Sequence, residues 1–189
     1  MSESESISGG TEMSESESIS GGMSESESVS DGTGMNVTER KETGRMLELR
    51  FMREEDLEQV EAIEQATFSS PWSLESFRKA METCGNLYVT ALWDDRVAGY
   101  CGLWRSFEEG DITNVAVDEA FRQRGIGRKM LSFLMEAAEK EGVTQFTLEV
   151  RRSNAAALHL YENLGFVSEG IRKNFYEKPT EDAVIMWKR

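Results

Sequence analysis

The sequence has few of the residues that most often bind zinc. It contains two cysteines, Cys84 and Cys101, and one histidine, His159. A structural zinc site takes four Cys or His ligands, and a catalytic one usually three protein ligands. A zinc site built from Cys and His is therefore nearly excluded, and we expect no metal. So little cysteine also indicates a protein of a reducing compartment, without structural disulfides.

The sequence also lacks the hydrophobic segments that direct a chain to or across a membrane. Its N-terminus is acidic and has no apolar core of the kind found in secretory signals. No apolar run approaches the roughly 20 residues that a membrane-spanning helix needs. We therefore expect a cytoplasmic protein with no membrane partner.

Positive charge is scarce as well. The formal net charge is −14 at pH 7, and half of it comes from the first 45 residues. Such a balance argues against direct nucleic-acid binding, which needs basic surface. It remains compatible with a basic peptide or a ribosomal protein as substrate.

Aromatic residues are absent from residues 1–45, where Ser, Glu and Gly dominate. The ten residues from Met1 recur from Met13 and, slightly changed, from Met23. Each unit is too polar to offset its ordering entropy, so residues 1–45 are predicted to form a disordered acidic tail. The tail is interpreted as a solubilising or expanded start region, or alternatively as a phosphorylatable, partner-binding segment. Residues 46–189 hold every aromatic residue and are predicted to form one domain.

Hydrophobic periodicity predicts a mixed sheet with helices on both faces, an α/β or α+β fold. The strands are expected at 47–52, 87–93, 97–104, 112–117, 146–150, 166–169, 171–176 and 183–187. Helices are expected after 54, from 73, over 126–141 and after Asn154, which would cap its helix.

The most informative segment follows the expected strand at 112–117. A glycine-containing loop leads directly into a helix, and Arg122, Arg124 and Arg128 surround it. Glycines allow a ligand to approach the backbone, and the first amides of a helix attract anions. The pattern indicates a site for a phosphate diester; the plain alternative is a turn with solvated arginines. It lacks the third glycine of dinucleotide folds and the Lys-Ser/Thr pair of nucleotide hydrolases.

Glu149 and Tyr161 are the residues best placed for chemistry. Glu149 alternates with apolar Leu148 and Val150, so it lies on the opposite face of its strand. It is ordinary if that face is solvated, but requires a purpose if helices cover both faces. Tyr161 falls on the inward side of its helix and is equally compatible with core packing. We expect His159 to have a structural or surface role.

Taken together, these segments resemble the GNAT acetyltransferase superfamily. The resemblance spans residues 46–189 and is strongest to its protein N-terminal acetyltransferases of the ribosomal-protein-alanine type, known as RimI. It is carried by the loop at 122–128, by 148–157 with 160–166, and by the shorter segments at 70–73, 174–176 and 181–186.

The resemblance implies a mostly antiparallel sheet whose middle strands splay apart around acetyl-coenzyme A. The donor's pantetheine arm would pair with the backbone of Val115, Ala116 and Val117. The cofactor would further be held by Asn154 and by the loop residues Gln123, Arg124, Gly125, Ile126, Gly127 and Arg128. Glu149 matches the family's general base, Tyr161 its general acid, and a backbone N–H near Val115 would bind the oxyanion.

The implied reaction is direct acetyl transfer to the N-terminal amine of a protein, with alanine or another small residue first. Trp72 and Tyr176 are candidates for the peptide groove, although core packing explains either equally well. The alternatives are transfer to lysine side chains or a small-molecule amine, or a non-catalytic acyl-coenzyme A-binding module. Neither cysteine has an evident base partner, which disfavours an acyl-cysteine step.

Overall fold

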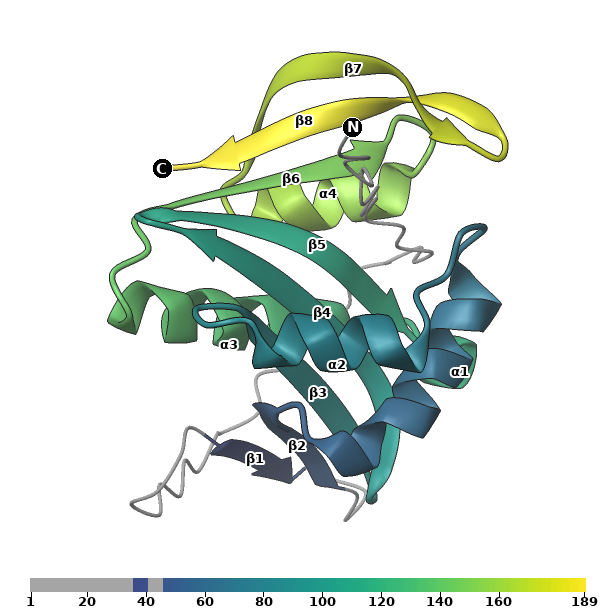
Figure 1. Ribbon diagram of the computed structural model, residues 1–189, viewed down its shortest axis with the longest axis vertical. Helices are drawn as coiled ribbons and strands as arrows, with labels where there is room; N and C mark the ends of the chain where they lie inside the picture. Colours follow the sequence, from purple (N-terminus) through teal and green to yellow (C-terminus); the bar gives the residue numbers. More distant parts are fainter. Residues whose placement is uncertain (1–35, 41–45) are drawn as a thin grey trace, which may run out of the picture.

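The computed structural model describes residues 36–40 and 46–189, which are built around one sheet (Figure 1). Its strand order is β1-β2-β3-β4-β5-β6-β8-β7. Strands β5 and β6 are parallel, and every other neighbouring pair is antiparallel. The predicted mixed, mostly antiparallel sheet is confirmed.

The chain forms β1 and β2, then η1, α1 and α2, then the meander β3-β4-β5, then η2 and α3, and last β6, α4, β7 and β8. The strands are β1 (Asn36–Arg40), β2 (Met46–Phe51), β3 (Leu87–Trp93), β4 (Arg96–Ser106), β5 (Glu109–Val117), β6 (Gln145–Arg151), β7 (Val167–Glu177) and β8 (Thr180–Lys188). The helices are η1 (Glu54–Asp56), α1 (Leu57–Thr67), α2 (Leu74–Glu82), η2 (Glu119–Phe121), α3 (Ile126–Lys140) and α4 (Ala155–Asn163). None of the helices described here is long and apolar enough to cross a bilayer.

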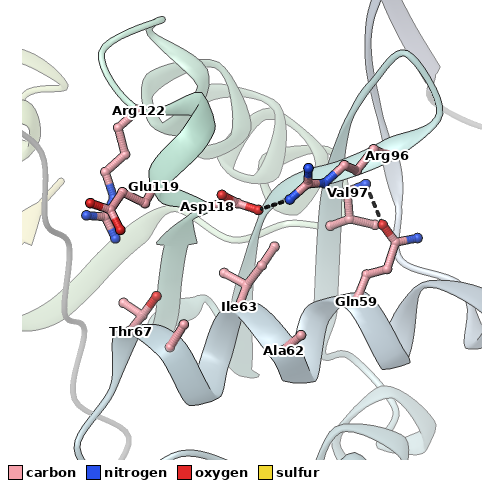
Figure 2. Close-up of a pocket in the computed structure, with 10 residues that line it drawn as sticks. Gln59, Ala62, Ile63, Thr67, Arg96, Val97, Asp118, Glu119 and Arg122 are labelled. Atoms are coloured by element: carbon pink, nitrogen blue, oxygen red, sulfur yellow. Dashed lines mark hydrogen bonds and ion pairs between the residues drawn. The ribbon is translucent and has the colours of Figure 1, made fainter.

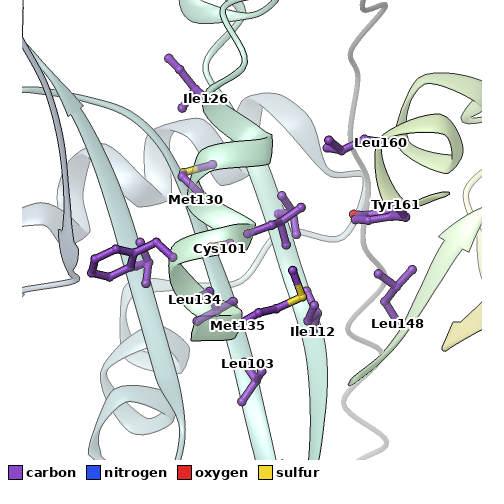
Figure 3. Packing of buried hydrophobic residues seen from close by; sticks show 14 of the residues in the cluster. Cys101, Leu103, Ile112, Ile126, Met130, Leu134, Met135, Leu148, Leu160 and Tyr161 are labelled. Carbon is purple, nitrogen blue, oxygen red and sulfur yellow. The ribbon is translucent and has the colours of Figure 1, made fainter. Parts of the chain in front are cut away.

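The helices cover both faces of the sheet, as predicted (Figure 1). On one face, α3 and α4 pack over a large core that includes Ile126, Leu148 and Tyr161 (Figure 3). On the other face, α1 and α2 enclose a smaller core around Val60 and Phe77. Apolar residues on both faces explain why the central strands read as nearly continuous hydrophobic runs.

Two sequence predictions differ from the structure at the edges of the sheet. The two strands expected at 166–169 and 171–176 are a single strand, β7, since the extended backbone continues through Gly170. The register of β7 against β8 shifts at two irregularities, but the pairing resumes after each of them. At the other edge, β1 pairs antiparallel with β2, so ordered structure begins before the boundary expected at Met46. The rest of the predicted tail lies outside the described residues.

Candidate active site

The site begins where the parallel strands β5 and β6 part. Their pairing runs from Glu109–Gln145 to Ile112–Leu148 and ends there. Beyond that point β5 stays paired with β4 on its other edge, where Cys101 faces Val115. The edge of β5 that carries Val115, Ala116 and Val117 is therefore not paired with β6 (Figure 1). An unpaired strand edge offers backbone donors and acceptors to an extended ligand.

The loop between β5 and α3 presents amides to the same end of the site. Gln123 and Gly125 have φ values of 61° and 71°, the left-handed region. Lys129 is the first residue of this helix whose amide donates a hydrogen bond to a carbonyl one turn earlier, that of Gly125 at 3.2 Å. The amides of Ile126, Gly127 and Arg128 precede it and have no carbonyl partner within the helix. Alternating backbone conformations before a helix N-terminus form an anion-binding concavity.

The space beside Gly125 fits a bulky anion. A Cβ atom built at this position would meet no other atom within 4 Å, so the backbone is open to a ligand. The positive φ also favours glycine over any residue with a side chain. A diphosphate group therefore fits the residues that the sequence singles out, both in charge and in access.

The three arginines of the loop do not act alike. Arg122 donates to the carbonyl of Val117 at 3.1 Å, and the guanidinium of Arg124 lies 5.0 Å from the ring centre of Trp93. Arg128 is exposed on the first turn of α3. The sequence groups all three around one anion, whereas in the structure two of them hold the loop and Arg128 remains the side chain available for a phosphate.

Glu149 lies on the face of β6 opposite the large core, as its alternation with Leu148 and Val150 predicts. Its Oε1 lies 3.0 Å from Nη1 of Arg172 on β7. Its backbone carbonyl accepts a hydrogen bond of 3.2 Å from the hydroxyl of Tyr176. Arg172 and Tyr176 of β7 therefore hold both the Glu149 carboxylate and the backbone of β6 in place.

Tyr161 lies on the other face of β6, on the side covered by α4. Its side chain is fully buried beside Leu148 and meets the ring of Phe166 edge-on at 5.9 Å (Figure 3). Asn154 caps this helix, because its side chain accepts a hydrogen bond of 3.1 Å from the amide of Ala157. The capping role predicted from the sequence is confirmed.

A cavity of about 870 Å³ lies between α2 and the outer end of β4. Trp72 lines it and packs against Trp104, with ring centres 5.8 Å apart. Tyr176 is not among its lining residues; it is buried, and the guanidinium of Arg151 lies 4.1 Å from its ring centre. The two groove candidates are therefore in different surroundings, and Trp72 alone faces a cavity.

A buried carboxylate holds the Trp72 segment in place. Glu64 of α1 accepts a hydrogen bond of 2.9 Å from the amide of Trp72 and another from the hydroxyl of Tyr100. It is only 1% exposed, so these donors replace the water that it loses. Sequence reasoning missed Glu64, since its partners lie on other elements.

Asp111 was also missed, although it lines the same cavity. It directly precedes the apolar run at 112–117, where an acid looks like a strand end. Burial, and then the charge of Glu149, raise the pKa of its carboxyl group to about 6. In the sequence Asp111 is marked only as an acid that directly precedes Ile112, the last residue of β5 that pairs with β6.

A second, smaller cavity of about 300 Å³ lies between α1 and the turn after β5 (Figure 2). Its wall includes an ion pair between Arg96 and Asp118 at 2.7 Å. Gln59 accepts a hydrogen bond of 3.1 Å from the amide of Val97 beside it. Of the three loop arginines Arg122 lines this cavity, whereas Glu149, Tyr161 and residues 123–128 do not.

The chemistry open to the two cysteines is limited. Cys101 lies on β4 and is fully buried in the large core, and burial raises the pKa of its thiol well above the usual range. Cys84 is exposed and lies outside both cavities. Within the described residues no group of His, Cys, Asp or Glu side chains is arranged to hold a metal ion.

Comparison with known proteins identifies the family. The sequence model of the Acetyltransferase (GNAT) family matches residues 57–166, from the start of α1 to the residue before β7. The chain belongs to the GNAT acetyltransferase family. It is an acetyl-CoA-dependent N-acetyltransferase.

Three of the similar proteins found for this GNAT chain share one type of name. A putative [ribosomal protein bS18]-alanine N-acetyltransferase of Bacillus subtilis is 37% identical over 140 residues, covering 74% of this chain and 93% of the relative. The [ribosomal protein bS18]-alanine N-acetyltransferase of Salmonella typhimurium is 43% identical over 136 residues, covering 69% and 89%. The crystal structure of the ribosomal-protein-S18-alanine N-acetyltransferase from Escherichia coli matches with a TM-score of 0.69 at 35% identity, covering 75% and 92%.

Proposed function

We propose that this enzyme acetylates the N-terminal α-amine of a protein that begins with alanine or another small residue, with ribosomal protein bS18 as the expected substrate. The names of its relatives support this acceptor. The observation that carries the proposal is the end of β5–β6 pairing at Ile112–Leu148, one residue before Glu149. The compartment proposed for this reaction is the cytoplasm.

The donor is proposed to lie along the unpaired edge of β5. Val115, Ala116 and Val117 supply backbone groups to its pantetheine arm in the manner of an added strand. The amides of residues 123–128 bind its diphosphate, and Arg128 adds a cation. The side-chain oxygen of Asn154 is occupied by the helix cap, so its amide nitrogen is the group proposed to contact the donor.

Two side chains on opposite faces of β6 are proposed to move protons. An α-amine has a reference pKa near 8, so it is mostly protonated at neutral pH and must lose a proton before it attacks. Glu149 takes this proton through a water molecule. Tyr161 protonates the leaving thiolate from the other face, and a backbone N–H at Val115 stabilises the oxyanion.

The transferase domain is proposed to span residues 46–189, and the strand β1 pairs with its edge strand β2. Residues 41–45 connect β1 to β2, so a truncation that starts at Met46 removes the edge strand. The activity of that truncated chain, compared with the full chain, tests whether β1 contributes to the catalytic domain.

A peptide panel tests the acceptor. Peptides that vary the first two residues are incubated with acetyl-CoA and the full-length protein, and fragmentation mass spectrometry locates the acetyl group. We expect acetylation of the α-nitrogen, fastest with alanine first. Matched peptides with a blocked α-amine and an internal lysine serve as controls. Acetylation of lysine alone, or only of small amines, would refute the proposed acceptor.

A further inference from the structure

Asp111 and Glu149 lie on one face of the sheet at the point where β5 and β6 part. Asp111 is the register partner of Thr147 on β6, so their side chains share a face. Glu149 follows Thr147 by two residues and points the same way. Diagonal neighbours of this kind are about 7–8 Å apart, close enough for each carboxylate to feel the other.

Asp111 also faces the 870 Å³ cavity, whose walls suit the start of a peptide. It is the one acidic residue among the described residues that line this cavity. Its register partner on β4 is Trp104, which packs on Trp72. The indole of Trp104 donates a hydrogen bond of 2.9 Å to the hydroxyl of Tyr88, and this bond fixes the ring. The cavity therefore combines a rigid aromatic wall with a single carboxylate.

The cations near Asp111 are bound to other acids. Lys79 of α2 pairs with Glu75 at 3.6 Å, and Arg105 of β4 pairs with Glu141 at 3.4 Å. Arg172 of β7 pairs with Glu149, as described above.

Asp111 itself has no hydrogen-bond or ion-pair partner in the part of the chain that the structure describes. It is half-buried. Burial, and then the charge of Glu149, raise the pKa of its carboxyl group to about 6, so at neutral pH it is an anion without a counterion. Holding an unpaired, partly buried charge is costly unless a ligand compensates it.

We propose that Asp111 binds the α-ammonium group of the acceptor and positions it for deprotonation at Glu149, while the wall of Trp72 and Trp104 contacts the first side chains. The inference rests on the proposed function, since it names the group that recognises the acceptor. It gives the site two carboxylates with separate roles: Asp111 binds the cation, and Glu149 accepts the proton.

The pH dependence follows from the direction of the pKa shift. As pH falls through about 6, Asp111 becomes neutral while the α-amine, with a pKa near 8, stays charged. The KM for the peptide should therefore rise below this pH, whereas the KM for acetyl-CoA should not. Because the pKa of Asp111 in the folded state lies above the ordinary value of an aspartate, the charge of Asp111 destabilises the fold at neutral pH.

The test compares Asp111→Asn with Asp95→Asn, a matched change at an exposed turn residue. In Asp111→Asn we expect the peptide KM at neutral pH to rise about tenfold or more, as for a lost charge-assisted hydrogen bond. Its peptide KM should no longer depend on pH around 6. The KM for acetyl-CoA should stay within twofold of wild type, about the scatter of such measurements. Thermal stability at neutral pH should be equal or higher, which a purely structural role would not give.

A des-amino peptide, identical except that it lacks the α-amine, separates charge recognition from general packing. Its inhibition constant should be the same for wild type and Asp111→Asn, because it offers no cation. An unchanged KM for the amino peptide in Asp111→Asn, with wild type active on α-amines, would overturn this inference alone. Equal loss of affinity for both peptides would also overturn it.

If wild type acetylated no α-amine, the proposed function would fail instead. Calorimetric titration of the two peptides in the absence of acetyl-CoA would then still test Asp111. If Asp111→Asn binds the amino peptide more weakly than wild type does, but binds the des-amino peptide equally well, the cation site is supported. If the amino peptide binds both proteins equally well, the cation site is contradicted.

Discussion

Nη1 of Arg172 lies 3.0 Å from Oε1 of Glu149, so the β7–β8 hairpin holds the proposed base on its strand. The guanidinium also lies 4.6 Å from the ring centre of Phe175 in the same hairpin. Arg172 is largely exposed, and an exposed pair of this kind contributes little to stability. The ion pair instead orients the carboxylate of Glu149 on the face of the sheet that bears Asp111.

Replacing Glu149 with Gln should lower kcat about tenfold or more, because the amide cannot accept the proton of the amine. The KM for acetyl-CoA should change little, since the donor is proposed to be held at α3 and β5. Steady-state kinetics at saturating peptide measure both. Glu169→Gln, which removes another glutamate paired with an arginine, is the control and should retain activity. Full activity in Glu149→Gln would refute its role as base.

Replacing Tyr161 with Phe should also slow turnover about tenfold or more, since only the proton donor is removed. The ring stays, so the buried contact with Phe166 and the thermal stability should be largely retained. A donor with a better leaving group than the thiolate of coenzyme A should recover part of the lost rate. A variant as fast as wild type with acetyl-CoA would exclude Tyr161 as the acid.

Arg128→Glu separates the fold from the anion site. An acid in the first turn of a helix interacts favourably with the helix dipole, so α3 should be as stable as before or slightly more. The same charge should weaken acetyl-CoA binding about tenfold or more by repelling the diphosphate. Calorimetry and thermal unfolding measure the two effects. Lys178→Glu, an equal change at an exposed residue of the β7–β8 turn, should leave the affinity for acetyl-CoA unchanged.

Glu64→Ala should lower the free energy of unfolding by about 3 kcal/mol, because the buried hydroxyl of Tyr100 and the part-buried amide of Trp72 lose their acceptor. Since one of them is the amide of Trp72, the peptide KM should rise as well. Urea denaturation and steady-state kinetics give the two values. Glu61→Ala removes a less buried bond to the amide of Leu74 and should cost about 1 kcal/mol. Equal losses in the two variants would contradict the special role of Glu64.

The sequence predicted the elements of the domain and its mixed sheet because apolar periodicity and caps are local signals. Ser73 and Asn154, for example, cap α2 and α4 as expected. The strand β1 was missed, since it is a short polar segment that owes its structure to pairing with β2. Strand pairing of this kind depends on a distant partner and leaves little trace in the segment itself.

The site residues also divide into those marked by local motifs and those that depend on distant contacts. Glu149, Tyr161 and the loop at 123–128 are predicted from the sequence because they stand in motifs that resemble a family, and their roles remain proposals. The two arginines that turn away from the anion site do so through contacts with Trp93 and Val117, which spacing does not reveal. Asp111 acquires its character from burial and from Glu149, far along the chain.

The central claim is that the amides before and within the first turn of α3 bind the diphosphate of acetyl-CoA. Isothermal titration calorimetry of the full-length protein with acetyl-CoA, at low and high salt, tests it most directly. We predict saturable binding at one site per chain that weakens as salt screens the phosphate charges. Absence of any heat of binding at low salt, in a protein shown to be folded, would contradict the account.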